Sequence, residues 1–404
     1  MINEKIIESC EKKLKKLYAR VEDVALFNQE KVLNAFKKNK IALRHFTGTS
    51  GYGYGDEGRD SLNRLVADIF HSENAICSPN IVSGTHALSL CLFGVLRHGE
   101  WALSITGEPY DTLNDVIKGK NNGSLEDYGI GFRSIPLKDN KIDKEKISLL
   151  LKKCDNYPSM IYMQRSRGYE WRNALSTEDI KDAVEFIRSL GFSGCIMLDN
   201  CYGAFMEKTE PTDVGVNLIA GSMIKNLGGG LAPTGGYVCG DDKYIQLVNN
   251  RLTAPSIGGE VGSYAPGYQQ FYQGIFLAPH TVSQAVKGVL LFSAVLSELG
   301  YETMPAPYEL PRDIILAVKF NDKQKLISFI QGIQNNSPID SYVSVLPWDM
   351  PGYSNQVIMA AGCFVQGSSI ELSADAPIKP PYIGYLQGGL TYEHCKIALK
   401  NMNL

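Results

Sequence analysis

Short apolar runs alternate with amphipathic stretches through the middle of the chain. Runs of three to six mostly aliphatic residues are typical of buried strands, and the stretches between them repeat apolar residues every three or four positions, as one face of a helix does. We expect strands at 75–77, 101–106, 132–137, 160–164 and 195–200, and helices from 83 onward and at 144–153 and 176–190. This alternation predicts an α/β fold in which a mostly parallel sheet is flanked by helices.

The flanks of this region are helical. Residues 2–20 and 24–36 carry apolar residues at helical spacing between lysines and glutamates, which predicts two helices near the N-terminus. Residues 254–279 are rich in Gly, Pro, Tyr and Gln and poor in charge, so we expect them to be buried in a site or at a subunit interface. A long apolar helix is expected at 281–299, after Pro279.

A proline-containing stretch at 305–311 is expected to link a C-terminal unit to the rest. Within that unit we expect an apolar segment at 314–320, helices at 323–333 and 392–401, and strands at 342–345, 357–362 and 369–372. The sequence therefore predicts three regions: an N-terminal helical arm (1–50), a large α/β domain (51–300) and a small C-terminal α+β domain (301–404).

Charge and cysteine content narrow the classes of partner. The 404 residues carry a net charge of −3, so the composition does not favour a nucleic-acid partner. Nine cysteines without a C-x-x-C pair, several of them inside apolar runs, are typical of reduced thiols in a cytoplasmic protein. The six histidines lack metal-ligand spacing and no run of 18 apolar residues occurs, so we expect neither a metal site nor a membrane partner.

One lysine stands alone in an apolar stretch. Lys225 is the only charged side chain in residues 214–240, where a chain with 21% charged residues would place about five or six. Burial disfavours the ammonium form and lowers the pKa of the amine, which makes a lysine a nucleophile towards carbonyl groups. A lysine at a strand end whose ammonium reaches solvent is the alternative interpretation.

A second stretch, 189–206, has Asp199 as its only charge. Asp199 lies at the end of an expected strand, where open α/β sheets bind their ligands. A lone acid and a lone amine at the ends of two strands suit pyridoxal phosphate, because its ring nitrogen needs a carboxylate and its aldehyde forms a Schiff base with lysine. We therefore expect this cofactor between Asp199 and Lys225.

A glycine-rich segment fits a different cofactor motif. Gly53, Gly55 and Gly58 match the G-x-G-x-x-G pattern of dinucleotide-binding loops, but the residues before them do not form an apolar strand. We therefore favour a loop of glycines and tyrosines that lines a site, and a dehydrogenase function is disfavoured.

Two further segments have the chemistry of binding loops. Ser83, Gly84 and Thr85 open a helix, and small residues there leave backbone N–H groups free for a phosphate. An ordinary N-cap by Ser83 or Thr85 explains these residues equally well. Tyr110 follows an expected strand, where its ring would lie flat on a planar cofactor or simply pack in the core.

Two arginines, Arg165 and Arg167, follow the expected strand at 160–164. The carboxyl end of a strand is a suitable place for bidentate binding of a substrate carboxylate or phosphate. Solvated surface arginines are the alternative interpretation.

Together with the segments GYGYGDEGRD, QRSRGY, LDNCYG and SIELSADAPIKPPY, these residues resemble the fold-type I pyridoxal-phosphate enzymes of the cystathionine lyase and methionine γ-lyase group. The resemblance covers nearly the whole chain and is closest to the aluminium-resistance branch. It implies the PLP-dependent transferase-like (aspartate aminotransferase) fold, pyridoxal 5'-phosphate as cofactor, an amino-acid substrate, and a homodimer at least, with a homotetramer expected.

The resemblance also implies roles for single residues. Lys225 would form the Schiff base, Tyr110 would stack on the ring, and Tyr54 would reach into the neighbouring subunit's site. The catalytic set would be Lys225 with Tyr54 and Tyr110 as candidate general acids. The cofactor would be bound by Ser83, Gly84, Thr85, Tyr110, Asp199, Tyr202, Ser222 and Lys225.

Three positions depart from the pattern of these lyases. Ile224 replaces a hydroxyl residue, Asp56 replaces the cross-subunit arginine, and Tyr385 replaces the arginine that binds the substrate carboxylate. We therefore expect the cofactor to be retained and the substrate to differ. The expected substrate contacts are Arg165, Arg167, Tyr54 and, as a weaker candidate, Lys379.

The expected reaction is an elimination. Lys225 would remove the α-proton of an amino acid, and a β- or γ-substituent attached through sulfur would leave, giving a keto acid and ammonia. An aminotransferase, or another reaction of the same cofactor on this fold, is the alternative. A non-catalytic cofactor-binding protein linked to metal resistance is less favoured.

Overall fold

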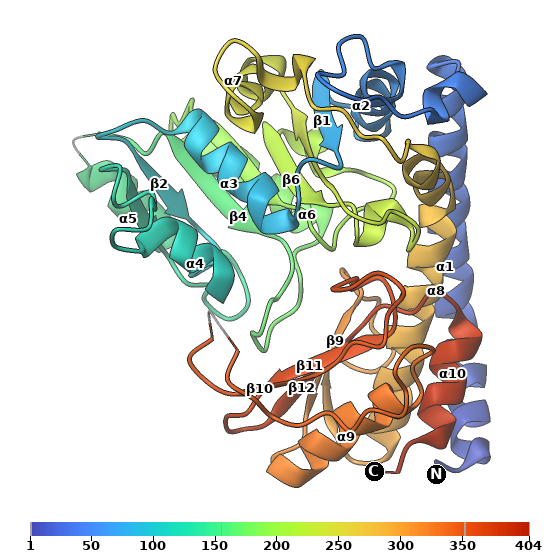
Figure 1. Ribbon diagram of the computed structural model, residues 1–404. Helices are drawn as coiled ribbons and strands as arrows, with labels where there is room; N and C mark the ends of the chain where they lie inside the picture. The colour runs from blue at the N-terminus through green and yellow to red at the C-terminus, as the bar shows by residue number, and fades with distance from the viewer. Residues whose placement is uncertain (1, 155, 351–352, 404) are drawn as a thin grey trace.

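A seven-stranded sheet and a five-stranded sheet form the frame of the protein in the computed structural model, which describes residues 2–154, 156–350 and 353–403 (Figure 1). The strand order of the larger sheet is β1-β7-β6-β5-β4-β2-β3. Strand β7 runs antiparallel to both neighbours and the other pairs are parallel, so the mostly parallel sheet is confirmed. Its strands are β1 (Asn74–Ser78), β2 (Trp101–Ser104), β3 (Gly131–Ser134), β4 (Met160–Gln164), β5 (Cys195–Asp199), β6 (Leu218–Ser222) and β7 (Gly236–Gly240).

Helices cover both faces of this sheet because its central strands are apolar on both sides. Strands β4, β5 and β6 are buried throughout. In β4, Tyr162 packs in one helical layer, whereas Ile161 and Met163 pack in the other. The first layer consists of α3 (Gly84–Val95), α4 (Asp111–Lys118) and α7 (Asp242–Leu252), and the second contains α2 (Glu57–Ile69), α5 (Lys144–Lys153) and α6 (Thr177–Ser189).

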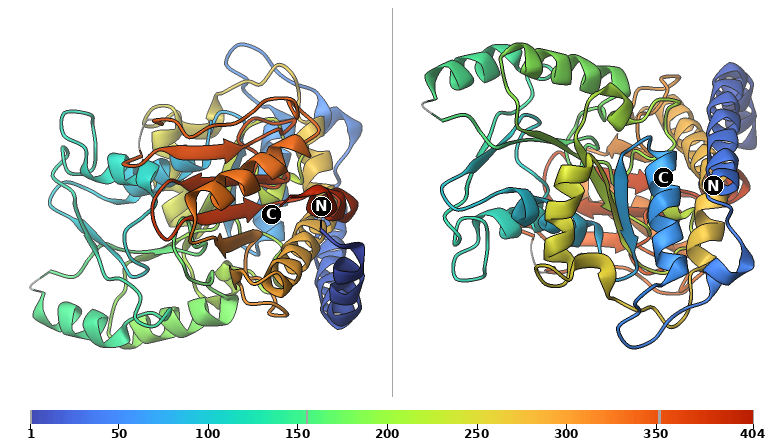
Figure 2. Two further views of the ribbon diagram at one scale, coloured as in Figure 1. Left: turned by 90° about the horizontal axis from the view of Figure 1, so that it is seen from below. Right: turned by 90° about the horizontal axis from the view of Figure 1, so that it is seen from above.

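Two long helices, α1 (Glu4–Lys38) and α8 (Gln269–Glu298), run side by side past both sheets (Figures 1 and 2). The expectation of two N-terminal helices is wrong, because no glycine or proline interrupts α1 between its two halves. Helix α8 also begins well before the expected start at 281, and Pro279 lies inside it. This part of α8 packs closely on a glycine turn, since a Cβ at Gly229 would lie 2.3 Å from the Gly274 carbonyl oxygen.

Helix α8 is long and apolar enough to cross a membrane by length and composition alone. However, 72% of its most apolar window is buried inside the protein. Such burial is typical of the central helix of a folded domain, which here joins the two sheets.

The smaller sheet is antiparallel throughout, with the order β10-β11-β12-β9-β8. Helix α9 (Lys323–Asn335) packs on it, and α10 (Tyr392–Asn401) packs on α8 and α9. The expected strands at 342–345 and 369–372 are wrong, because neither segment pairs with a neighbour and β11 begins only at Ser373. The strands are β8 (Glu302–Met304), β9 (Ile315–Lys319), β10 (Val357–Ala360), β11 (Ser373–Pro377) and β12 (Ile383–Gln387).

The stretch 254–279 does not form one segment. Its first part is a loop with a short 3₁₀ helix, and its second part belongs to α8. The loop contacts the glycine-tyrosine segment near residue 54, because the Gly262 N–H donates to the Tyr52 carbonyl oxygen at 2.9 Å. The 3₁₀ helices are η1 (Leu43–Phe46), η2 (Pro211–Val214), η3 (Asn226–Gly228) and η4 (Gly258–Glu260).

The beginning and the end of the chain are bound to each other (Figure 1). The Ile2 N–H donates to the Lys400 carbonyl oxygen at 3.2 Å, and Lys400 forms an ion pair with Glu4 at 3.0 Å. Further along α1, Glu11 pairs with Lys396 of α10 at 3.0 Å. The first half of α1 is therefore fixed by α10.

Candidate active site

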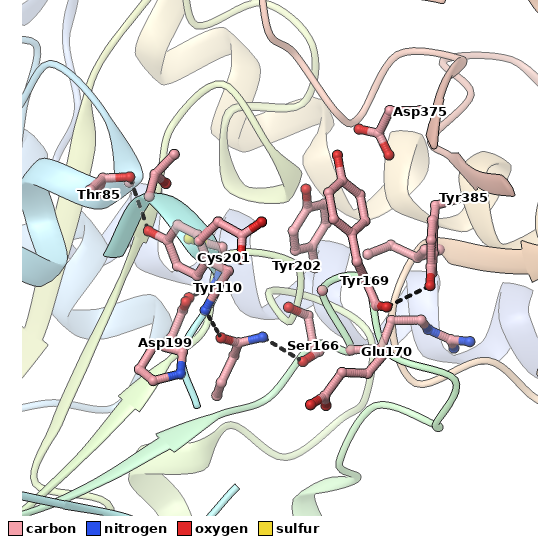
Figure 3. Close-up of a pocket in the computed structure, with 18 of the residues that line it drawn as sticks. Thr85, Tyr110, Ser166, Tyr169, Glu170, Asp199, Cys201, Tyr202, Asp375 and Tyr385 are labelled. Atoms are coloured by element: carbon pink, nitrogen blue, oxygen red, sulfur yellow. Dashed lines mark hydrogen bonds between the residues drawn. The ribbon is translucent and has the colours of Figure 1, made fainter. Parts of the chain in front are cut away.

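A cavity of about 540 Å³ lies between the carboxyl ends of β4, β5 and β6 and the strands β9, β11 and β12 of the smaller sheet (Figure 3). Such a volume is typical of sites that bind cofactors and small molecules. Ten of the twelve expected site residues line it, drawn from both sheets: Ser83, Gly84, Thr85, Tyr110, Arg167, Asp199, Tyr202, Ser222, Lys225 and Lys379.

Asp199 is the last residue of β5 and is almost completely buried. One carboxylate oxygen accepts a hydrogen bond from the Cys201 backbone N–H at 3.0 Å. Burial raises the pKa of this carboxyl group, and the contacts with Cys201 and the charge of Lys225 only partly oppose that rise. None of the ion pairs among residues 2–154, 156–350 and 353–403 includes Asp199. The carboxylate thus lacks the cation that a buried acid normally has.

Lys225 follows β6 and is partly buried. Its Nζ lies 4.0 Å from the centroid of the Tyr202 ring, a cation–π contact. Burial lowers the pKa of this ammonium group, but Tyr202, Cys201 and Asp199 act in the opposite direction and the net pKa is raised. The expectation that burial would lower the pKa of Lys225 is therefore wrong for the protein without a ligand, because the surrounding groups stabilise the charged form.

The amino end of α3 faces Ser222, the last residue of β6. A Cβ placed on Gly84 would lie 3.0 Å from the Cys201 Sγ and 3.4 Å from the Ser222 Cβ, so only glycine leaves this space open. Ser83 caps the helix by accepting a hydrogen bond from the His86 N–H at 3.0 Å. The backbone N–H groups of Gly84 and Thr85 in the first turn have no intrahelical acceptor, which makes this end of α3 suited to an anion.

Tyr110 closes the same side of the cavity. Its hydroxyl lies 3.0 Å from the Thr85 Oγ1, and its backbone N–H donates to the Gln164 side-chain oxygen at 3.2 Å (Figure 3). These two contacts fix the ring at the edge of the cavity, between the amino end of α3 and strand β4. Burial and the charge of Asp199 raise the pKa of the phenol, so Tyr110 is neutral at physiological pH.

These groups fit pyridoxal phosphate. A buried carboxylate without a cation suits a protonated ring nitrogen, and the amino end of α3 with the Ser222 hydroxyl suits a phosphate. Lys225 supplies an amine in the same cavity, and Tyr110 an aromatic ring. Cofactor and amine would thus meet in one space that both sheets enclose.

The expected role of Arg165 in binding substrate is wrong. Its guanidinium is buried and does not line the cavity. It donates to the Asn200 side chain at 2.9 Å and to the Gly203 carbonyl oxygen at 3.0 Å, and it pairs with Glu207 at 2.7 Å. Arg165 therefore holds together the segment after β5, and each of its three guanidinium nitrogens is bonded within the protein.

Arg167 does line the cavity. It is almost fully buried, pairs with the buried Asp313 at 3.4 Å and donates to the Met304 carbonyl oxygen. Its Nε has no hydrogen-bond partner among the described residues. An unpartnered buried donor beside a cavity is a suitable contact for an oxygen of a ligand.

Tyr54 lies apart from the other expected site residues. It is 68% exposed, its ring contacts that of Tyr52, and it does not line the cavity of its own chain. Asp56, which replaces an arginine of the lyases, is buried and accepts hydrogen bonds from the Arg59 N–H and the Tyr268 hydroxyl. Asp56 therefore stabilises the start of α2.

The sequence did not single out Asp375, Tyr169 and Gln387, which also line the cavity. Tyr385, the third departure, pairs with Asp375 across strands β11 and β12, and its hydroxyl donates to the Tyr169 carbonyl oxygen at 2.6 Å. The strand order of the smaller sheet brings Asp375 to the site, and no motif in the sequence encodes that order.

Comparisons with known proteins connect this chain to a family. A family model described as methionine gamma-lyase matches residues 3–403. The protein YnbB of Bacillus subtilis (strain 168) is 46% identical over 387 residues, which are 95% of this chain and 91% of YnbB.

Solved structures give the same result. The crystal structure of a carbon-sulfur lyase involved in aluminum resistance from Clostridium novyi NT has 50% identity and a TM-score of 0.94, covering 98% of this chain and 95% of that one. The pyridoxal-5'-phosphate dependent protein YhfS from Escherichia coli has a TM-score of 0.62 at 14% identity, covering 95% of this chain and 97% of that one. The likeness to YhfS shows the fold alone, and it agrees with the expected fold type.

Proposed function

The chain belongs to the methionine gamma-lyase family, and from this premise we propose that it is a pyridoxal-phosphate-dependent lyase that breaks a carbon–sulfur bond of an amino acid by β- or γ-elimination. The observation that supports the proposal best is the pair Asp199 and Lys225. These two charges line one cavity at the ends of adjacent strands, next to the amino end of α3.

Each part of the cofactor has a matching group in the cavity. Lys225 would hold it covalently through Nζ, and Asp199 would face the ring nitrogen. The first turn of α3, at Gly84 and Thr85, and the Ser222 hydroxyl would bind the phosphate. Once bound, pyridoxal phosphate supplies an electron-accepting ring that stabilises negative charge on the α-carbon of the substrate.

The residues of the chain then control protons. Lys225 Nζ would take the α-proton of the substrate, and the buried carboxylate of Asp199, which pairs with no cation among the described residues, would hold a proton on the ring nitrogen. The Nε of Arg167 would bind the substrate carboxylate. Tyr110, neutral and bound to Thr85, would donate a proton to the leaving group.

Tyr54 would complete the site of a second copy of the chain. Its exposure in a single chain agrees with a dimer in which sites are shared, and a homotetramer is a further part of this proposal. Co-refolding of Lys225→Ala and Tyr54→Phe chains tests the sharing. If each variant alone is inactive, a 1:1 mixture should recover about a quarter of the normal activity, because about half of its dimers are mixed and each mixed dimer has one unaltered site of two. No recovery would contradict the shared site.

The decisive experiment is the Lys225→Ala variant. The normal protein should show the visible absorbance of a lysine-bound cofactor and release ammonia and a keto acid from S-substituted cysteine or homocysteine. The variant should lose both. Ammonia release without any keto-acid acceptor separates a lyase from an aminotransferase. A normal protein without the visible absorbance would refute the proposal. A Lys225→Ala variant that keeps both this absorbance and the release of ammonia and keto acid would refute it as well.

A further inference from the structure

The smaller sheet contributes a carboxyl group to the lining of the cavity, Asp375 of β11. Gln387 on the adjacent strand donates its side-chain N–H to Asp375 Oδ2 at 3.2 Å. The oxygen of the same amide accepts the Tyr202 hydroxyl at 3.1 Å, which fixes the orientation of Gln387. Two side chains thus position the Asp375 carboxylate at the cavity.

Asp375 has no cation of its own. Of the ion pairs formed within the described ranges of the chain, none includes this residue. Two other acids of the cavity do have a cation: Glu170 pairs with Arg172 at 2.6 Å and Glu108 with Lys118 at 2.7 Å. Lys225 affects Asp375 only at longer range, and under the proposed function its amine is occupied by the cofactor.

Burial of a carboxylate without a cation is unfavourable in free energy, and a ligand that supplies a positive charge offsets this cost. Burial raises the pKa of Asp375 to about 7, and Tyr169, Gln387 and Lys225 only partly oppose this. The group therefore lies near the midpoint of its titration at neutral pH. A cation placed beside it would shift it fully to the charged form.

The neighbouring position strengthens this view. Tyr385 lies directly across from Asp375 in the strand register, and its hydroxyl is already bound to the Tyr169 carbonyl oxygen. Strands β11 and β12 therefore present a carboxylate for a positive group, while Arg167 of the same cavity remains the proposed contact for the substrate carboxylate.

We propose that Asp375 determines substrate specificity by binding a second ammonium group, so that the substrates are amino acids whose side chain or leaving group ends in a cation. The inference rests on the proposed function. It adds the class of substrate and names the residue that selects it.

Diamino acids without a sulfur leaving group test the recognition apart from carbon–sulfur cleavage, and ammonia release is monitored for 2,4-diaminobutyrate, whose distal amine is on the γ-carbon. The probes are 2,4-diaminobutyrate, ornithine and lysine, each paired with the neutral isostere that has a methyl in place of the distal ammonium: norvaline, norleucine and 2-aminoheptanoate. Dissociation constants are measured at pH 8 by calorimetry on the cofactor-loaded protein. Normal protein should prefer the ammonium at one length or more by about tenfold or more.

Two variants distinguish the effect of Asp375 on this preference from the effect of removing any negative charge from the cavity. Asp375→Asn keeps the shape and should reduce the preference to within about twofold. Glu170→Gln removes a charge from the same cavity and should leave the preference intact. A normal protein without preference at every length, or a preference unchanged in Asp375→Asn, overturns the inference. If the neutral isosteres bind to a coloured protein while the preference is missing, only this inference fails, whereas a protein that takes up no cofactor refutes the proposed function as well.

Discussion

Asp199 and Lys225 stand at the carboxyl ends of the neighbouring parallel strands β5 and β6, and each affects the pKa of the other. Burial raises the pKa of Asp199 and the charge of Lys225 opposes that rise. Strand order places these residues on one cavity although 25 positions of sequence separate them.

Substitution of Asp199 by asparagine should reduce kcat by roughly 10²–10³-fold, the range found when one electrostatic contact to a reacting group is lost. Asparagine can still accept the hydrogen bond from Cys201, so the fold should persist. The charge that keeps the ring nitrogen protonated is lost, however. Steady-state kinetics and the cofactor spectrum measure the effect. Unchanged kcat would show that Asp199 has only a structural role.

Alanine at position 84 should weaken cofactor binding by about tenfold or more. The added Cβ would meet Cys201 and Ser222, and the amino end of α3 would have to move away from β6. Fluorescence titration of the apoprotein gives the dissociation constant. Gly332→Ala in α9 is the control, because its Cβ would meet only the flexible end of Met402. Equal affinities in both variants would contradict a phosphate site at Gly84.

Lysine at position 167 should raise KM for the amino acid by about tenfold and change kcat little, since a ground-state contact is lost. The variant keeps a positive charge next to Asp313 but loses the Nε, which has no partner in the part of the chain that the structure describes. Arg165→Lys is the matched control. Its guanidinium is bonded away from the cavity, so KM should stay constant while stability falls. The same KM change in both variants would exclude Arg167 as the carboxylate contact.

The preference for a distal ammonium should fall several-fold as the pH drops from 8 to 6. The pKa of Asp375 is raised to about 7, so the carboxyl group is charged above this pH and neutral below it. The groups that face it are Lys225, Tyr169, Tyr353, Tyr385 and Tyr202. For the first four the pKa is raised above its ordinary value, so none of them changes charge in this window.

Calorimetry with lysine and 2-aminoheptanoate from pH 6 to 8 measures the preference. Asp375→Asn serves as the reference, because an amide does not titrate and its profile should be flat. A preference that increases towards low pH would contradict the assignment.

The sequence predicted correctly those helices and strands that depend on neighbouring residues, such as a helix start or an apolar run. The helix expected at 176–190 is α6, which begins with a capping box of Ser176 and Asp179, and the apolar run 160–164 forms β4 as expected. Predictions failed where contacts with residues distant in the sequence determine where a helix or strand begins. Pro279 is tolerated inside α8, which packs on the turn at Gly229. The segment 369–372, expected as a strand, ends directly before β11, which begins at Ser373.

Among the site residues, too, those with a local mark in the sequence were predicted and those that depend on the fold were not. Lys225 and Asp199 could be found because each is the only charge in a long apolar stretch. Arg165 and Arg167 are equivalent in sequence, and only the positions of Asn200 and Glu207 show that Arg165 is already bound within the protein. Asp375 was missed because one acid in a C-terminal strand has no local mark, and its position depends on strand order in the smaller sheet.

The contact between α1 and α10 has a consequence for synthesis on the ribosome. Glu11 and Glu4 find their partners only when Lys396 and Lys400, 385 and 396 residues later, have been made. The apolar residues Ile7, Cys10 and Leu14 of the same helix also wait, because α1 packs on α8, which at about 5–20 residues per second is complete only about 15–60 seconds later. During that interval the nascent chain presents a ready target for chaperones.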